Sequence, residues 1–190
     1  MARCFEAKKS KAGKEIKCGR CEAKIVPGEL YFYFAVGFRG VKQIRCKLHH
    51  PKQSELCGNK MSGAYAANEN IEATLNDPHV TISDIASTLE DAAGEIEQVR
   101  DEYQDSYDNL PENFQQADQG QEIESNIEGL MSYAETLQIA ADEVTALESE
   151  VTEAESADEN TDDEDDPQTI EDLLDQAKEL AQNALDEFSL

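Results

Sequence analysis

The sequence predicts an α+β protein: a small module built on a β-hairpin, followed by an all-α region that forms an antiparallel helical hairpin or a coiled coil. Three observations lead to this fold class. Four cysteine and histidine side chains form two close pairs on either side of a strand-like stretch in the first third of the chain. Further along, two long runs of apolar residues take three-four spacing, the period of amphipathic helices. The charge also divides between these two regions.

The charge division is steep for a chain of 190 residues. Residues 1–65 contain fourteen Lys/Arg and five Asp/Glu, a net charge of +9, whereas the remaining 125 residues contain two Lys/Arg and thirty-seven Asp/Glu, a net charge of −35. A basic module can meet phosphate and an acidic region cannot. A high-salt host would also explain acidity, but the lysine-rich first third argues against that explanation.

The two close pairs are Cys18 with Cys21 and Cys46 with His49, separated by twenty-four residues. Four such ligands in two bidentate pairs suit one tetrahedral structural zinc ion. A closed site of this kind leaves no open position for catalysis, so we expect one structural Zn²⁺ and no catalytic residue.

Two other residues compete for places in this site. His50 is an alternative fourth ligand because it adjoins His49, although the matching spacing of the two pairs favours His49. Cys57 is a weaker alternative, eleven residues after Cys46. A site without metal, in which the cysteines are simply buried, is the remaining alternative.

The other cysteine and histidine residues give no catalytic pattern. Cys4 has no partner at ligand spacing and is predicted to be a plain thiol, and His79 is predicted to lie in a turn. An odd number of cysteines favours a reduced compartment with a metal site over a disulfide framework. The first residues lack a signal-peptide core and the chain lacks a membrane-spanning apolar run. We therefore expect a cytoplasmic protein that is neither secreted nor bound to a membrane.

The elements of the module follow from its composition. Residues 1–15 are basic and predict a flexible or edge segment. Residues 30–36 and 41–44 are rich in aromatic and β-branched side chains around Gly37, which predicts a hairpin. A hairpin between two ligand pairs, with the second pair in a turn or short helix, indicates a treble-clef or ribbon-like plan. The module is small, so metal binding would supply folding energy.

The helical region follows residues 54–75, which predict a short helix or connector. A first long helix is expected over 82–110, with Thr81 and Asp84 as a capping box. A break is expected at 109–112. A second helix is expected over 123–151, after a weak point at Gly120. Two apolar stripes across a short break favour an antiparallel hairpin, and a dimer that buries the same stripes is the alternative.

The end of the chain predicts a tethered helix. Residues 154–166 are acidic and of low complexity, which predicts a disordered linker. Pro167 follows at a helix start, and apolar residues recur on one face beyond it. This helix is expected either to pack on the hairpin or to serve as a docking peptide. The predicted domains are the basic module, the helical hairpin, the linker and the last helix: 1–65, 66–154, 155–167 and 168–190.

Basic residues surround the predicted ligands, with aromatic residues between them. Phosphate binding uses such charges, and exposed aromatics can stack on bases. Alternatively, positive charge gathers near thiolates and the aromatics form the hairpin core. The candidate nucleic-acid contacts are Lys17, Arg20, Lys24, Arg39, Lys42, Arg45 and Lys47, and the aromatics are Tyr31, Tyr33 and Phe38.

The carboxylates of the helices follow no metal-ligand or acid–base pattern. The sequence has no Glu-x-x-His pair of the kind that di-iron bundles use, and no glycine-rich phosphate loop or nucleophile elbow. The helix carboxylates are therefore expected to form a solvated helix face. We therefore predict a protein that is not an enzyme and has no small-molecule substrate.

The first third resembles the zinc fingers of the poly(ADP-ribose) polymerase type, in the treble-clef group. The resemblance covers residues 5–65 and rests on the Cys18–Cys21 pair, on Lys24–Glu29 leading into a strand, and on a late second pair. That family closes with His-x2-Cys, whereas this chain has Cys46-x2-His49, so recognition of DNA breaks is not carried over. The layout is also similar to small zinc-finger proteins of tailed bacteriophages, which implies residence in a host cell's cytoplasm. The stretches 38–46 and 107–112 add to this second resemblance.

Together these features predict a non-enzymatic zinc-finger protein. Its basic module would contact nucleic acid or a nucleic-acid-processing protein, and its helices would bind a protein partner or self-associate. An adaptor with purely structural zinc is one alternative. An acidic region that mimics nucleic acid and inhibits a host protein, or that folds back on the basic module, is another.

Overall fold

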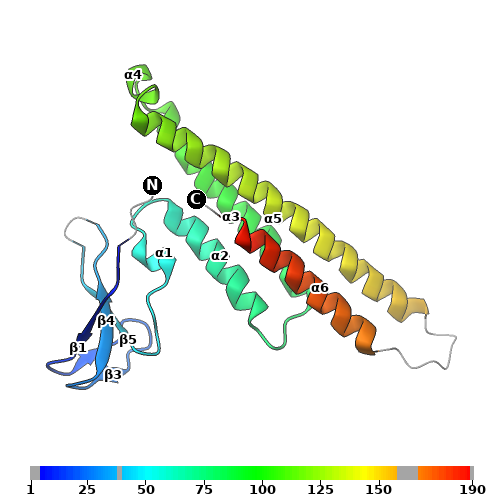
Figure 1. Cartoon of the computed structure of the whole chain (residues 1–190), viewed down its shortest axis with the longest axis horizontal. Coiled ribbons are helices and arrows are strands. Elements are labelled where there is room, and N and C mark those ends of the chain that lie inside the picture. Colours follow the sequence, from blue (N-terminus) through cyan, green and yellow to red (C-terminus); the bar gives the residue numbers. More distant parts are fainter. Residues whose placement is uncertain (1–4, 38–39, 158–166, 189–190) are drawn as a thin grey trace. The chain divides into compact units, whose positions relative to one another are not determined.

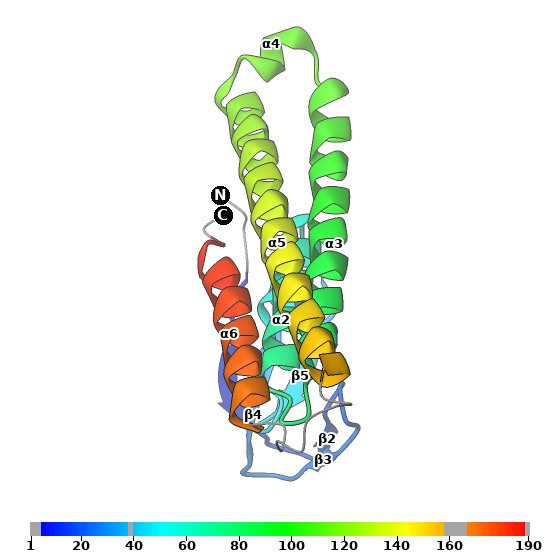
Figure 2. The same ribbon diagram turned by 90° about the vertical axis from the view of Figure 1, so that its right-hand side faces the viewer.

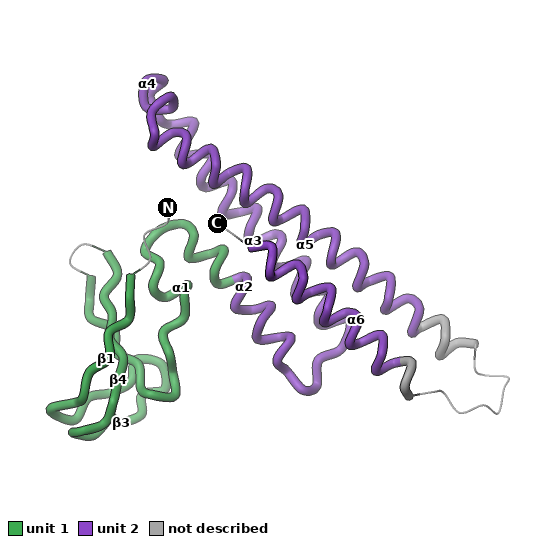
Figure 3. The backbone as a smooth tube through the Cα atoms, in the orientation of Figure 1, with its two compact units in different colours: residues 1–66 green, residues 67–190 purple. Residues whose placement is uncertain are grey.

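The computed structural model describes residues 5–37, 40–157 and 167–188. The chain divides into two compact units, the head (residues 1–66) and the helical unit (residues 67–190), as Figure 3 shows. The boundary falls within one helix, α2 (Met61–Leu75). A small antiparallel sheet region thus precedes long helices, as the α+β prediction required.

The head contains two small antiparallel sheets. The larger has the order β1-β4-β5, with β4 (Leu30–Phe34) between β1 (Lys8–Lys11) and β5 (Gln43–Cys46). The smaller pairs β2 (Ile16–Lys17) with β3 (Lys24–Ile25). The pairing of β4 with β5 confirms the predicted hairpin, and β1 confirms an edge segment near the N-terminus. The first strand of the hairpin ends two residues earlier than predicted.

A tight turn connects β3 to β4. The amide of Glu29 donates to the carbonyl oxygen of Val26 at 3.1 Å, and Gly28 between them has φ +93°. Pro27 precedes this glycine, and the combination of proline with a positive-φ glycine defines a type II turn. The turn therefore fixes where β4 begins.

One part of the head core surrounds the first ligand pair. Tyr31 on β4 is buried there with Ala12, Cys18 and Ile25. Further apolar side chains of the head are buried as well, among them Phe32, Phe34 and Met61. A unit of this size gains limited stability from apolar burial, so a bound metal ion would add to it.

Two helices follow the sheets. α1 (Gln53–Leu56) is a single turn, and α2 (Met61–Leu75) spans fifteen residues. Sequence reasoning predicted only a short helix or connector over 54–75. The helix tolerates Gly63, since a single glycine costs a helix about 1 kcal/mol and burial of Met61 and Ile71 outweighs that cost.

The helical unit contains a long hairpin. α3 (Ile82–Asp108) and α5 (Asp118–Ala157) lie side by side and antiparallel, joined through the short α4 (Glu112–Gln115), as Figures 1 and 2 show. α6 (Pro167–Asp186) packs against α5 and α3. Of the two arrangements expected for the last helix, the structure has the packed one.

The start of α3 is fixed by the predicted capping box. The Asp84 amide donates to Thr81 Oγ1 at 3.1 Å, and Asp84 Oδ2 accepts from the Thr81 amide at 3.0 Å. The hydrogen bonds from the Thr81 side chain and amide lower the pKa of Asp84 below its usual value. The break after α3 also falls at Asn109 and Pro111, as predicted.

The limits of α5 differ from the prediction. The helix begins at Asp118, and Gly120 in its first turn lies against the backbone of Gln115: a Cβ atom at Gly120 would overlap the Gln115 carbonyl. The glycine is thus required by a close approach and is not a weak point. The helix continues to Ala157, so the first residues of the predicted linker are helical. The rest of that linker, 158–166, lies outside the described residues.

The helices of this unit pack through small side chains. α6 buries three alanines and Leu185, and the Tyr133 ring on α5 contacts Phe188 with ring centroids 4.9 Å apart. Tyr133 also donates a hydrogen bond of 2.7 Å to the Asn68 side chain. Burial raises the pKa of this tyrosine, which therefore stays neutral. The buried alanines of α6 are Ala177, Ala181 and Ala184.

No helix in the described part of the chain combines the length and the apolar character that crossing a membrane requires.

Replacing Leu137 with Ala should lower the free energy of unfolding by about 2–5 kcal/mol, because this side chain is fully buried on α5. Urea denaturation of the full chain, followed by circular dichroism, measures the change. Ile139→Ala is the matched control, since Ile139 lies on the same helix but is 60% exposed. It should change stability by less than about 0.5 kcal/mol, and equal effects of both variants would contradict the described packing.

Candidate metal centre

The first ligand pair lies at the tip of the β2–β3 hairpin. The Cys18 amide donates to the carbonyl of Ala23 at 3.0 Å, and the Glu22 amide donates to the carbonyl of Cys18 at 3.0 Å. These bonds fold the chain back between Cys18 and Cys21. Glu22 has φ +57°, a conformation that residues other than glycine adopt infrequently. The tight turn thus brings both sulfur atoms to the same side of the hairpin.

The second ligand pair lies where β5 ends. Cys46 is the last residue of that strand, and His49 follows in a turn. The His49 amide donates to the Cys46 carbonyl at 3.0 Å. Of the two forms expected for this segment, the structure has the turn. A backbone bond of 2.8 Å from the Gly19 amide to the Ile44 carbonyl connects the two pairs.

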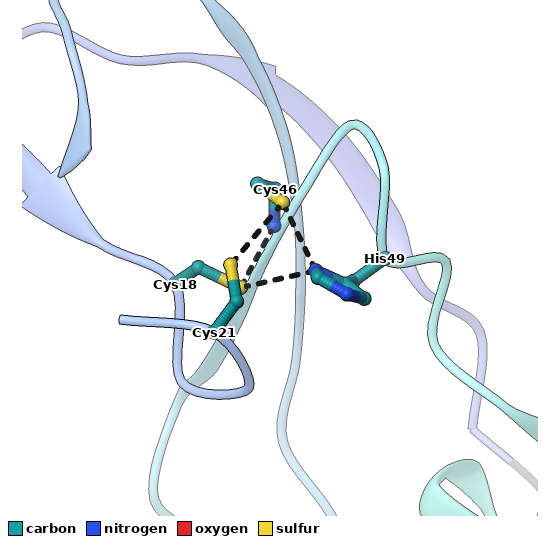
Figure 4. Close-up of side chains that lie close together, drawn as sticks. All are labelled: Cys18, Cys21, Cys46 and His49. Carbon is teal, nitrogen blue, oxygen red and sulfur yellow. Dashed lines mark hydrogen bonds between the residues drawn. The ribbon is translucent and has the colours of Figure 1, made fainter. Parts of the chain in front are cut away.

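The four side chains converge on one point, as Figure 4 shows. One ligand atom from each lies within 4.8 Å of all the others. The sulfurs of Cys21 and Cys46 are 3.9 Å apart, and Nδ1 of His49 lies 3.9 Å from the Cys18 sulfur and 3.2 Å from the Cys46 sulfur. A metal–sulfur bond of about 2.3 Å at a tetrahedral angle places two sulfurs roughly 3.8 Å apart. The group can therefore hold one metal ion.

The local electrostatics prepare Cys18 to act as a thiolate ligand. Burial by itself raises the pKa of Cys18, but hydrogen bonds from the backbone at Cys21, Arg20 and Cys46 outweigh it and bring the pKa to about 6. The Cys46 amide contributes one of these bonds, at 3.3 Å. A thiolate is the form that coordinates metal.

Cys21 behaves in the opposite way. A bond from the Ala23 backbone lowers its pKa, but burial and the neighbouring sulfurs of Cys18 and Cys46 together raise it. Thiolates this close repel one another unless a cation lies between them. A bound metal ion would offset that repulsion with its own positive charge, and it would favour the deprotonated form of each coordinating thiol.

The competing ligands do not join the cluster. The ring of His50 packs on Phe32, with centroids 4.3 Å apart, so the choice between the adjacent histidines falls on His49. Cys57 is buried in a disulfide and is also outside the cluster. The disulfide at Cys57 differs from the reduced thiols that the cysteine pattern predicted. Cys4 lies outside the described residues.

His79 lies between α2 and α3, as the turn prediction placed it. Its amide donates to Oδ1 of Asp77 at 2.9 Å. Its side chain is no part of the metal-ligand cluster.

Most of the predicted nucleic-acid contacts are exposed on the head. Lys17 and Lys24 lie opposite each other on β2 and β3, and Arg20 lies between the first two ligands. Lys47 is exposed between the second two, whereas Arg39 lies outside the described residues.

Arg45 differs from these residues and corrects one prediction. Its side chain is buried, 7% exposed, and Nη2 donates to Oε1 of Glu55 at 2.8 Å. Burial acts to raise the pKa of Glu55, but the bonds from Arg45 and the Lys52 amide outweigh it and lower the pKa. A buried, paired guanidinium does not reach a phosphate. This pairing could not be predicted from the sequence, because alternation along β5 does not distinguish an arginine paired across the fold from an exposed one.

The aromatic residues divide in the same way. Tyr31 belongs to the head core, so for this residue the core alternative is correct. Tyr33 is partly buried, and Nζ of Lys42 lies 3.9 Å from the centre of its ring. Lys42 therefore covers an aromatic face while remaining exposed itself. Phe38 lies outside the described residues.

No family model, no curated protein and no solved structure matches this chain. The resemblance to zinc fingers of the polymerase and bacteriophage types therefore stays a prediction from motifs.

His49→Ala should abolish stoichiometric metal binding, because it removes one of the four converging ligands. Native mass spectrometry of the full chain with one equivalent of metal measures the stoichiometry. His50→Ala is the matched control and should keep one ion per chain, since His50 packs on Phe32. Equal loss in both variants would contradict the assignment.

Metal binding should release more protons per ion at about pH 5 than at about pH 7. The Cys18 thiol has a pKa of about 6, so it is protonated at the lower pH and mostly ionised at the higher. Cys21, with its raised pKa, gives up a proton at both. Calorimetry in buffers of different ionisation enthalpy counts the protons, and equal counts at both values would refute the assignment.

Proposed function

We propose that this protein is a non-enzymatic zinc-finger protein whose basic head binds nucleic acid. The observation that carries the proposal is the convergence of three cysteines and one histidine at tetrahedral distances. Zinc is the ion we assign, because three thiolates and an imidazole form a donor set typical of structural zinc sites. All four positions are filled by protein, so the ion would have a structural role.

The charges around this centre support a nucleic-acid ligand. Arg20 and Lys47 each lie within a ligand pair and are exposed. Lys17 and Lys24 extend the positive surface along the adjoining hairpin. Ion pairing with phosphates draws on such side chains and releases condensed counterions, which makes binding fall with salt. The alternative partner is a nucleic-acid-processing enzyme with an acidic surface, because such a surface carries the same negative charge as nucleic acid.

The helical unit supplies the second part of the proposal. Its charge is opposite to that of the head, so it does not bind phosphate, and we assign it to protein contacts or self-association. The adaptor alternative, which uses the last helix as a docking peptide, receives less support. α6 already buries its alanines within its own unit. A role as a nucleic-acid mimic rests on charge alone.

Lys47→Ala should weaken binding of the full chain to a short DNA or RNA duplex and reduce the dependence of log K on log salt by about one unit. Fluorescence anisotropy at several salt concentrations measures both quantities. Lys178→Ala is the matched control, because it removes one lysine from the helical unit and should leave binding unchanged. Absence of binding by the wild-type chain at low salt would overturn the nucleic-acid part and leave the metal centre unaffected.

A further inference from the structure

Arg45 is held on several sides, although it adjoins the metal ligand Cys46. Nε and Nη2 both donate to Oε1 of Glu55, at 3.3 and 2.8 Å, and Nη2 also donates to the Gln43 side chain at 3.3 Å. The guanidinium carbon lies 5.4 Å from the centre of the Phe34 ring. These contacts restrain the guanidinium to one conformation. They therefore hold β5 in place just before Cys46.

The same guanidinium reaches the first ligand pair. Nη1 donates to the carbonyl oxygen of Ile44 at 3.1 Å, and this oxygen also accepts the Gly19 amide at 2.8 Å. Gly19 lies between the first two cysteines, and a Cβ atom there would be 2.8 Å from Nη1 of Arg45. The guanidinium therefore lies directly against the backbone that carries Cys18 and Cys21.

Glu55 fixes the other side of the pair. Its Oε2 accepts the amide of Lys52 at 3.2 Å, which caps the start of α1, while its Oε1 accepts from Arg45. The Glu55 side chain is partly buried, with 23% of it exposed. The pair thus joins three segments: the turn of the first two ligands, the strand of the third, and α1.

Stability alone gives a weak reason for such a pair. Buried ion pairs often contribute no more than apolar residues of the same volume, because burying the two charges costs about as much as their attraction returns. Residues behind the ligands of metal sites do have a defined effect, since they orient the ligands and alter metal affinity by about 10–100-fold. The location of Arg45, between both ligand pairs, fits that second role.

We infer that Arg45 and Glu55 are positioning residues for the metal centre, holding the Cys18–Cys21 pair and the Cys46–His49 pair at the separation that one tetrahedral ion requires. This inference rests on the proposed metal binding. It assigns to Arg45 a role in the protein's interior in place of contact with phosphate. The ion pair acts through the backbone at Gly19 and Ile44 and touches no ligand sulfur through its charged atoms.

The test is a Co²⁺ titration of the full chain, because tetrahedral thiolate-bound Co²⁺ has visible ligand-field and charge-transfer bands that report the positions of its ligands. Glu55→Ala removes the partner of Arg45, and Glu55→Gln keeps the shape and an oxygen acceptor but removes the charge. The matched control is Glu15→Gln. Glu15 pairs with Lys24 at 2.9 Å in the same head, but with both side chains more than half exposed.

We expect Glu55→Ala to bind Co²⁺ about 10–100-fold more weakly and to give shifted or weakened bands even when saturated. Glu55→Gln should fall between this variant and the wild type, and Glu15→Gln should match the wild type in both measurements. The spectrum at saturation is decisive, because a pair that only stabilised the fold would lower the apparent affinity without changing the saturated bands.

Two results separate failure of this inference from failure of the proposed function. A wild-type chain without tetrahedral Co²⁺ bands overturns the metal centre itself. A wild-type chain with such bands, and a Glu55→Gln variant with the same affinity and the same saturated spectrum, overturns the positioning role. The glutamine variant decides the question if the alanine variant fails to fold, since it preserves the volume and one of the two acceptor oxygens at position 55.

Discussion

Closure of the two cysteine and histidine pairs on one point is the constraint on which the head depends. Its apolar core, a cluster around Tyr31 together with side chains such as Phe34 and Met61, belongs to a unit small enough that apolar burial alone gives limited stability. Cys18 belongs both to that core and to the cysteine–histidine cluster, so the packing of the head and the candidate metal centre share a residue. A cation at this point would also offset the repulsion between neighbouring sulfurs, which would otherwise oppose closure.

The positive charges of the head lie in two different environments. Arg45 is buried and balances Glu55, whereas Arg20 and Lys47 are exposed beside the same ligands. A buried guanidinium must be paired, because transfer of an isolated charge from water to the interior costs far more than one salt bridge returns. Net charge therefore overstates the positive charge that is exposed on the surface of the head, part of which lies in the turns of the two cysteine and histidine pairs.

The helical unit is stabilised by different means. Its buried residues include many alanines, which let helix axes approach closely, and fully buried Leu89, Leu130 and Leu137 provide the larger apolar contacts. Local signals fix where its helices start: the Thr81–Asp84 capping box begins α3, and a close approach of backbone at Gly120 accompanies the start of α5. The many carboxylates of this unit lie mainly on exposed faces, where water solvates them.

The sequence by itself determined the cysteine and histidine residues that cluster, the hairpin between them and the two long helices. These features follow from short-range patterns: paired ligands two residues apart, alternating and three-four spacing, and a capping box. Tertiary structure alone decided between His49 and His50 and paired the buried Arg45 with Glu55. It also made Gly120 a packing requirement and placed α6 on the hairpin. Each of these outcomes depends on which residues distant in sequence meet in space, and a pattern within a few residues carries no information about that partner.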